Sequence, residues 1–190
     1  MTESYLSVVE SKRFLGREFL TWLVGRLEEE GGRMEIAGDI VELALGDRVV
    51  LEEGGDPGAR LSLVDEGDIR PELGAGLRRG KLLDRARLSI TRGERRWELT
   101  LDGGLLTYDA LRCPKLGDRD PGLREDRRAA FENDLFLRLA DIEDAVGVLD
   151  RLFAAFCRLR ASESWDRRGL PELRSWIEHL GGPRARTASA

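Results

Sequence analysis

The chain has 190 residues, of which 41% are hydrophobic and 35% charged, and its formal net charge is −5. This length fits one large domain or two small ones, and it is enough to bury a core. The charge is high but nearly balanced, which excludes a wholly disordered chain. Because the net charge repels nucleic acid and anionic membranes, any binding to DNA has to come from a local basic surface.

The cysteine content and the apolar runs favour the cytoplasm. Two cysteines, Cys113 and Cys157, are too few for a secreted disulfide framework, and we predict that both are reduced, buried thiols. The first ten residues lack the basic and apolar regions of a secretory signal peptide. No apolar stretch approaches the roughly 20 residues of a membrane span. We therefore expect a cytoplasmic protein that makes no use of a membrane.

A helix and a hairpin are expected in the first part of the chain. Apolar residues recur at helical spacing over residues 11–30 and predict an amphipathic helix there. Beyond it, apolar and polar residues alternate over 41–45 and 49–52, with Gly46-Asp47 between them as a two-residue turn. The pattern therefore predicts two antiparallel strands joined as a hairpin.

A three-stranded meander follows. The chain leads to it through a loop at 53–60, a short strand at 61–64 and a short helix at 68–80. The three strands are expected at 85–91, 95–101 and 105–111, and glycine-containing turns separate them. Apolar residues alternate with charged ones along these strands, which indicates a sheet with one wet face.

The last third of the chain is predicted to be helical. Residues 114–122 are rich in turn formers and mark a possible subdomain boundary. Helices are expected at 123–132, 141–160 and 171–180, the second capped by Asp141, whereas 135–139 fits a helix or a strand. We predict an α+β fold in one compact domain over 1–182, with an antiparallel sheet (hairpin plus meander) flanked by helices, and a disordered tail over 183–190.

No residue pattern indicates catalysis, a metal or a cofactor, so we expect a protein that is not an enzyme. The one histidine, His179, falls at a predicted helix end and has no cysteine at ligand spacing. The segment from Gly76 to Lys81 resembles a phosphate-binding loop, but it is one residue short and Leu82 stands where Ser or Thr must hold magnesium. That segment predicts instead a helix end followed by a strand.

Basic residues gather in one stretch of this acidic chain. Arg78, Arg79, Lys81, Arg85, Arg87 and Arg96 are the candidates for contact with DNA phosphates. Arg85 and Arg87 share one face of a predicted strand, and Arg96 lies opposite Trp97, so a wet basic sheet face is expected, suited to the DNA backbone rather than to bases. The alternative is that these arginines pair with Glu94, Glu98 and the acidic loops.

Tryptophans could add stacking on bases. Trp22, Trp97 and Trp176 fall on predicted apolar faces, where a place in the core is expected. Trp165 lies in the polar segment Ser-Glu-Ser-Trp-Asp and is expected to be the exposed one.

Residues 61–160 resemble the C-terminal half of the recombination-associated RdgC proteins. The features that carry the resemblance come in order: Arg79-Gly-Lys-Leu-Leu, Trp97-Glu-Leu-Thr-Leu, Asp102-Gly-Gly-Leu-Leu-Thr-Tyr, Phe131-Glu-Asn-Asp-Leu-Phe-Leu and the helix from Ile142 to Phe156. The resemblance implies an α+β fold, a nucleoid-type role, sequence-independent binding of duplex DNA by a ring-like dimer and restraint of RecA-driven recombination. The N-terminal half of that family has no counterpart in this sequence.

Two hypotheses of function follow. The first is a non-enzymatic, RdgC-like protein that binds duplex DNA as a homo-oligomer and is associated with the nucleoid. The second is a protein–protein interaction or dimerisation module without affinity for DNA, in which the acidic half of the chain and the apolar helix 141–160 form a dimer or docking face.

Overall fold

We describe the computed structural model of the chain over residues 13–29, 31–36, 38–53, 56–64, 68–116 and 127–181. The N-terminal elements are α2 (Arg13–Glu29), β1 (Arg33–Ile36), β2 (Asp39–Glu53), β3 (Asp56–Val64) and α3 (Arg70–Arg78). After them come β4 (Lys81–Arg92), β5 (Arg95–Asp102), β6 (Thr107–Arg112), α4 (Arg127–Arg160), the π-helix η1 (Trp165–Gly169) and α5 (Leu170–His179). The fold is therefore α+β, as predicted, with a helical C-terminal part.

The strands form one antiparallel sheet of six strands, in which five follow the order β1-β2-β4-β5-β6 and the sixth, β3, also pairs with β2. The long strand β2 organises it, because β1 pairs with its residues 39–42 and β3 with its residues 48–53, while β4 runs along its other edge. The predicted meander is confirmed: β4 pairs with β5 and β5 with β6. In this register Leu88 lies opposite Leu99 and Ile90 opposite Trp97.

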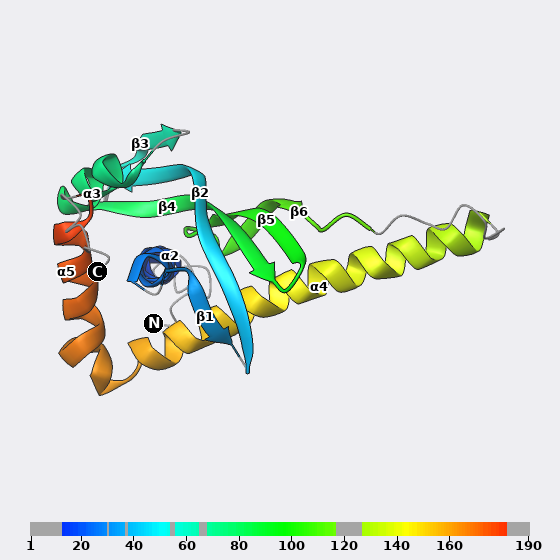
Figure 1. Cartoon of the computed structure of the whole chain (residues 1–190). Coiled ribbons are helices and arrows are strands. Elements are labelled where there is room, and N and C mark those ends of the chain that lie inside the picture. Colours follow the sequence, from blue (N-terminus) through cyan, green and yellow to red (C-terminus); the bar gives the residue numbers. More distant parts are fainter. Residues whose placement is uncertain are drawn as a thin grey trace, which may run out of the picture.

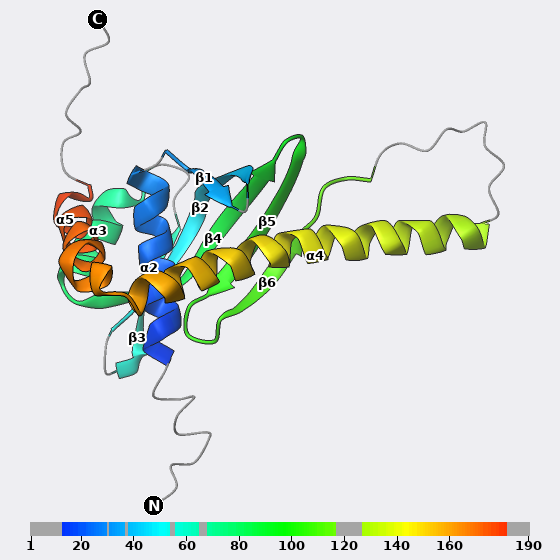
Figure 2. The ribbon, with the colours of Figure 1, turned by 90° about the horizontal axis from the view of Figure 1, so that it is seen from below.

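One face of the sheet carries the core. Leu88, Ile90, Trp97 and Leu99 alternate along β4 and β5 and are fully buried. Helix α2 packs across β4 and β2, and the C-terminal half of α4 lies on the same side (Figures 1 and 2). Aromatic rings extend this core between the helices, with Phe156 5.6 Å from Phe19 and 5.8 Å from Trp165 between ring centroids.

The predicted hairpin at 41–52 is wrong. Residues 39–53 form the single strand β2, and Gly46-Asp47 lies inside it. The register with β4 shifts between Leu45 and Val49, so this segment is a bulge rather than a turn. A side chain at residue 46 would press on Arg87, which is why glycine fits there. The expected loop at 53–60 is also shorter than predicted, because β3 begins at Asp56.

Residues 127–132 and 141–160, which were predicted to lie in two separate helices, belong to one helix, whereas the predicted last helix at 171–180 is confirmed as α5. Helix α4 runs unbroken over 34 residues, so the ambiguous segment 135–139 is helical. Asp141 is not a cap: it is buried in mid-helix, where Arg95 and Arg138 pair with it. At about 1.5 Å per residue the helix is roughly 50 Å long. From Asp141 onward the helix packs on the body, and its first part projects away from the body (Figure 2).

Trp165 was predicted to be exposed, and this is wrong. Its ring is 2% exposed and stacks edge-on against Phe156, with the guanidinium of Arg160 5.3 Å from its centroid. The π-helical turn η1 places it there, although its sequence neighbours are polar. The predicted burial of Trp22 and Trp97 is confirmed, and Trp176 is half-buried.

Candidate functional site

Three of the six predicted phosphate contacts lie together on the sheet face opposite the core. Arg85 and Arg87 alternate with buried residues of β4, and Arg96 alternates with Trp97 on β5. We call this surface the open sheet face, because α2 and α4 lie on the opposite face of the sheet (Figure 1). The predicted sidedness of these three arginines is therefore correct.

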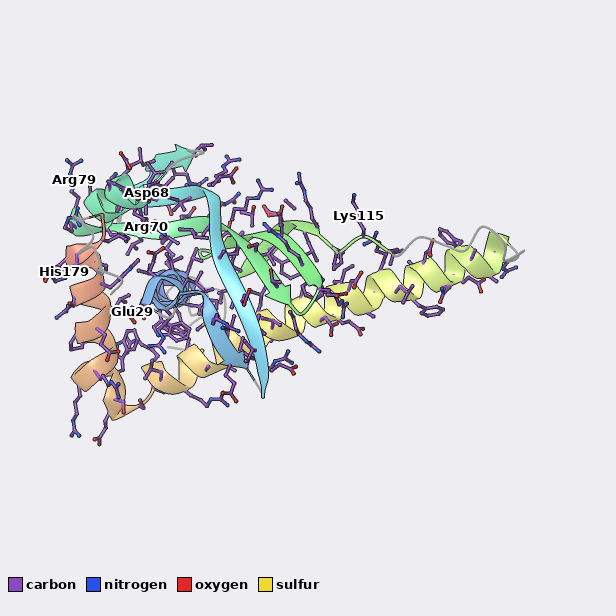
Figure 3. The ribbon with its side chains drawn as sticks, in the orientation of Figure 1. Glu29, Asp68, Arg70, Arg79, Lys115 and His179 are labelled. Atoms are coloured by element: carbon purple, nitrogen blue, oxygen red, sulfur yellow. The ribbon has the colours of Figure 1, made fainter. Side chains whose placement is uncertain are left out.

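The other three candidates lie elsewhere. Arg78 donates from Nη1 to the carbonyl oxygens of Ile177 at 3.0 Å and of Leu180 at 2.9 Å, so it holds the C-terminal end of α5 against α3. Arg79 lies in the turn between α3 and β4, where Gly80 has a φ of 82°, and Lys81 is the first residue of β4. Figure 3 shows Arg79 beside α3. The segment 76–81 is thus a helix end followed by a strand, as predicted.

The open sheet face also holds arginines that the sequence did not single out. Arg48 of β2 and Arg60 of β3 join Arg85 of β4 around a groove of about 410 Å³, beside the hydroxyl-bearing Ser62 and Thr100. Residues 39–72 are acidic overall, so these two cations were not predicted to join the basic stretch. Only the pairing of β2 with β3 on one edge and with β4 on the other brings them together.

Carboxylates balance much of this charge. Arg85 Nη2 lies 2.8 Å from Asp102, and Arg87 Nη2 lies 3.0 Å from Glu98. Glu98 also forms ion pairs with Arg96 at 3.1 Å and with Arg112 at 3.7 Å. The hydrogen bond from Arg87 is the main reason that the pKa of Glu98 lies below its usual value. Pairing with Glu98 is what the alternative interpretation of the basic stretch predicted.

A buried carboxylate pair lies beneath β3. Glu52 and Asp84 are each 3% exposed, and Arg17 of α2 pairs with both, at 2.9 Å to Asp84. Arg60 approaches from the solvent side, 3.6 Å from Glu52 and 3.8 Å from Asp84. Adjacent buried carboxylates can serve acid–base chemistry. Here two guanidinium groups compensate them, so the cluster ties α2 to the sheet.

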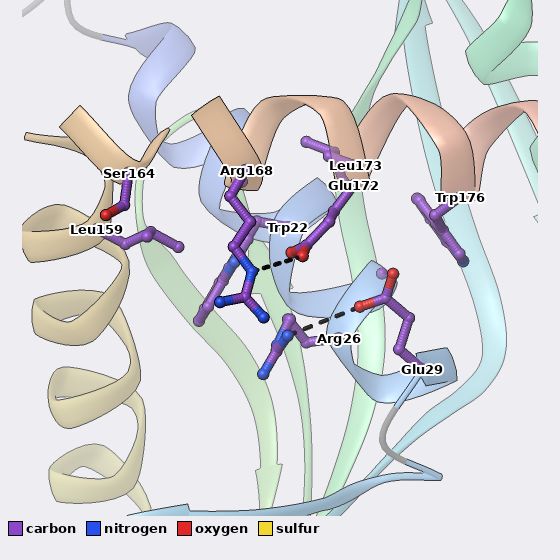
Figure 4. A pocket seen from close by; sticks show the side chains of 11 residues that line it. Trp22, Arg26, Glu29, Leu159, Ser164, Arg168, Glu172, Leu173 and Trp176 are labelled. Atoms are coloured by element: carbon purple, nitrogen blue, oxygen red, sulfur yellow. Dashed lines mark hydrogen bonds and ion pairs between the residues drawn. The ribbon is translucent and has the colours of Figure 1, made fainter. Parts of the chain in front are cut away.

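A pocket of about 410 Å³ opens between α2, η1 and α5 (Figure 4). Trp22, Leu173 and Trp176 form apolar parts of its wall. Its rim carries two ion pairs, Arg168 with Glu172 at 2.9 Å and Arg26 with Glu29 at 3.7 Å. The lining contains no serine–histidine or cysteine–histidine pair, and its charges are balanced, so the pocket indicates no reaction.

The projecting half of α4 is the most unusual surface. We call residues 128–140 the arm. Phe131 and Phe136 are each 67% exposed, and three leucines on the arm are each 47% exposed: Leu135, Leu137 and Leu139. The buried stripe of the same helix begins at Asp141 and continues through Ala145, Leu149 and Phe156. Large apolar side chains thus continue along the helix beyond the point where the body of this chain covers them.

The remaining ionisable groups show little that would support catalysis. Within the described ranges, no three His, Cys, Asp or Glu side chains gather in a way that could hold a metal ion. His179 is exposed in the last turn of α5, where its Nδ1 lies 2.7 Å from the carbonyl oxygen of Ser175. Cys113 and Cys157 are free and half-buried, and desolvation raises the pKa of both thiols.

No described helix is both long and apolar enough to cross a membrane. No protein-family model, curated protein or solved structure matches the chain. The resemblance to the RdgC proteins therefore stays a prediction, and the function has to be argued from the surfaces themselves.

Proposed function

We propose that the protein is a non-enzymatic interaction module whose arm binds a protein partner. The observation that carries this proposal is the run of exposed Phe and Leu side chains on a helix that projects from the body. A helix that is apolar on most sides is ordinarily buried. Contiguous apolar surface of this kind marks an interaction site on a folded protein.

The position of the arm supports the same function. The body of the chain already buries Leu149, Leu152 and Phe156 of α4, so the helix is anchored without the arm. The arm is therefore not needed to complete the core. A rigid helix that presents apolar side chains in successive turns is a common mode of protein recognition, since its side chains enter a groove or pack on a second helix.

A photo-crosslinking experiment tests the proposal. A photoreactive phenylalanine analogue replaces Phe136 in the full chain, and cells that express this chain are irradiated. We expect a covalent adduct of higher mass. The control carries the analogue at Arg167, which is 80% exposed on η1, far from the arm. Adduct formation at residue 136 that does not exceed that at residue 167 would contradict the proposal.

Binding of the duplex DNA backbone is a second candidate. It is supported by the groove on the open sheet face, where Arg48, Arg60 and Arg85 come from three different strands. Arg87 and Arg96 continue the basic surface along β4 and β5. Phosphates would have to compete with the carboxylates that already pair with four of these arginines. A link to recombination or to the nucleoid rests on the resemblance to the RdgC proteins alone.

Fluorescence anisotropy of a labelled duplex tests this second candidate. The expected result is binding that weakens steeply with salt and that the double change Arg85→Glu and Arg87→Glu abolishes, because contacts with phosphates release counterions. A double change of Arg167→Glu and Arg168→Glu on η1 is the matched control. Absence of binding at low salt would exclude direct contact with DNA by this chain.

A further inference from the structure

We infer that the partner of the arm is a second copy of this chain, which pairs with it antiparallel about Leu135. The inference rests on the proposed function of the arm and names the occupant of that surface. A two-fold symmetric contact brings the same surface of both copies together, so a suitable surface has to be complementary to itself. The arm has this property in its apolar pattern, its charges and its length.

The apolar pattern is symmetric about Leu135. Phe131, Leu135 and Leu139 are spaced by four residues and form one ridge along the helix. Helices that pack side by side along their length cross at a shallow angle of about 20°, which keeps such a ridge against its partner over several turns. In an antiparallel pair with Leu135 on the two-fold axis, Phe131 of each copy lies level with Leu139 of the other. Every exposed residue of the ridge then has an apolar partner.

The charges of the arm favour the antiparallel direction. Glu132 lies three residues before Leu135, and Arg138 lies three residues after it. Antiparallel pairing therefore sets Glu132 of one copy level with Arg138 of the other, and would extend the ion pairs that these side chains make with Arg128 and Asp141 of their own chains. A parallel pair in register would instead set Glu132 beside Glu132 and Arg138 beside Arg138.

The length of the arm limits where the second copy can pack. Beyond Asp141 the helix is covered by its own body, with Ala145 and Val148 each 1% exposed. Residues 128–140 extend about as far before Leu135 as after it, so two antiparallel arms overlap over most of this segment. Within it Ala130 is buried and Arg138 donates to the carbonyl oxygen of Pro114 of the same chain, and neither belongs to the ridge. Their bodies then lie at opposite ends of the pair and do not collide.

The area that becomes buried supports only a weak dimer. The ridge of each copy contributes Phe131, which is 67% exposed, and two leucines that are each 47% exposed. With aromatic side chains at about 150–250 Å² each, the two ridges together would bury on the order of 600 Å². That area is below the size of standard specific interfaces. We therefore expect a dimer that dissociates on dilution rather than a permanent one.

Sedimentation velocity of the purified full chain over a range of concentrations tests the inference. We expect a reversible monomer–dimer equilibrium. Leu135→Glu should raise the dissociation constant more than about tenfold, because it puts two like charges on the two-fold axis in place of buried apolar surface. Leu105→Glu is the matched control, since Leu105 is 61% exposed in the turn before β6 and lies outside the arm. Circular dichroism checks that both variants are folded.

Disulfide trapping tests the direction. In a chain that carries Cys113→Ser and Cys157→Ser, one sample has Phe131→Cys and a second has Leu139→Cys. Mixing the two before oxidation should give far more crosslinked dimer than either sample alone. Equal or greater crosslinking within the Phe131→Cys sample would overturn the antiparallel arrangement.

The two proposals can fail separately. A chain that stays monomeric at every concentration, while the analogue at residue 136 crosslinks to a different protein, overturns pairing between copies and leaves the arm as an interaction surface. A monomeric chain whose residue 136 crosslinks no more than residue 167 overturns both. A crosslinked adduct of two copies, together with dissociation by Leu135→Glu, supports both.

Discussion

Arg17 shows how a single residue can hold two layers of this fold together. Its guanidinium comes from α2 and pairs with Glu52 of β2 and Asp84 of β4, both nearly inaccessible to solvent. Removing one partner from a buried ion cluster leaves an uncompensated charge, which costs about 3–5 kcal/mol. We predict that Arg17→Met lowers the free energy of unfolding by about that amount, measured by urea denaturation.

The control for Arg17 is an exposed ion pair. Arg33 and Glu42 lie 3.4 Å apart and are 66% and 57% exposed. Exposed pairs contribute about 0–1 kcal/mol, so Arg33→Met should change the free energy of unfolding by less than about 1 kcal/mol. Equal losses for the two variants would show that the Arg17 cluster contributes no more than a surface contact.

Glu98 predicts a dependence of stability on pH. The hydrogen bond from Arg87, together with the charges of Arg87, Arg96 and Arg112, lowers its pKa in the folded chain. A carboxyl group whose pKa is lower in the folded chain than in the unfolded chain stabilises the fold at pH values above its unfolded pKa of about 4.3. This stabilisation is lost as the pH falls through the pKa of the folded chain. Glu98→Gln should therefore flatten the loss of stability below about pH 4.3. Urea denaturation at several pH values measures it, and identical acid slopes for both chains would contradict the assignment.

The sequence predicted on which face of the sheet a side chain lies wherever apolar and polar residues alternate along a strand. Arg85 and Arg87 alternate with Leu88 and Ile90, and both sets lie on the faces expected. Trp165 was not predictable in this way. Its neighbours in sequence are polar, and only the π-helical turn directs its ring toward Phe156.

At the scale of elements, α4 is two segments with different surroundings. Leu152, in the second segment, is 3% exposed in the core, whereas Leu137, in the arm, is 47% exposed. Truncating a buried leucine costs about 2–5 kcal/mol. We predict that Leu152→Ala costs that much, while Leu137→Ala changes the free energy of unfolding by less than about 0.5 kcal/mol in dilute protein. Equal losses would mean that the arm is part of the core.

The sequence predicted most elements and misjudged how some of them join. Hydrophobic periodicity located α2 and the meander, because their apolar residues face one core. It divided α4 into three segments, since the apolar pattern of residues 131–139 surrounds the helix and shows no single period. It placed a turn at Gly46-Asp47, because a local signal for a turn cannot distinguish a hairpin from a bulge when the neighbouring strand comes from residues 81–92.

At the scale of the whole molecule, contacts within the chain determine which surfaces remain available to bind a partner. The chain carries a net charge of −5. On its open sheet face, arginines already form ion pairs with Asp102, Glu98 and the buried carboxylates. The arm, by contrast, has apolar side chains that its own body does not cover. The sequence could not show this contrast, since it depends on where the body of the protein ends along α4.

Association through the arm makes the stability of the whole molecule depend on its concentration. A dimer that forms only from folded chains shifts the equilibrium toward the folded state by mass action. We predict that the Tm of the full chain, measured by scanning calorimetry, rises by a few degrees over about a hundredfold increase in protein concentration. Leu135→Glu should abolish this dependence, because it prevents pairing, and should leave the Tm at low concentration unchanged, because Leu135 lies outside the core. A concentration dependence that survives in Leu135→Glu would assign the association to another surface.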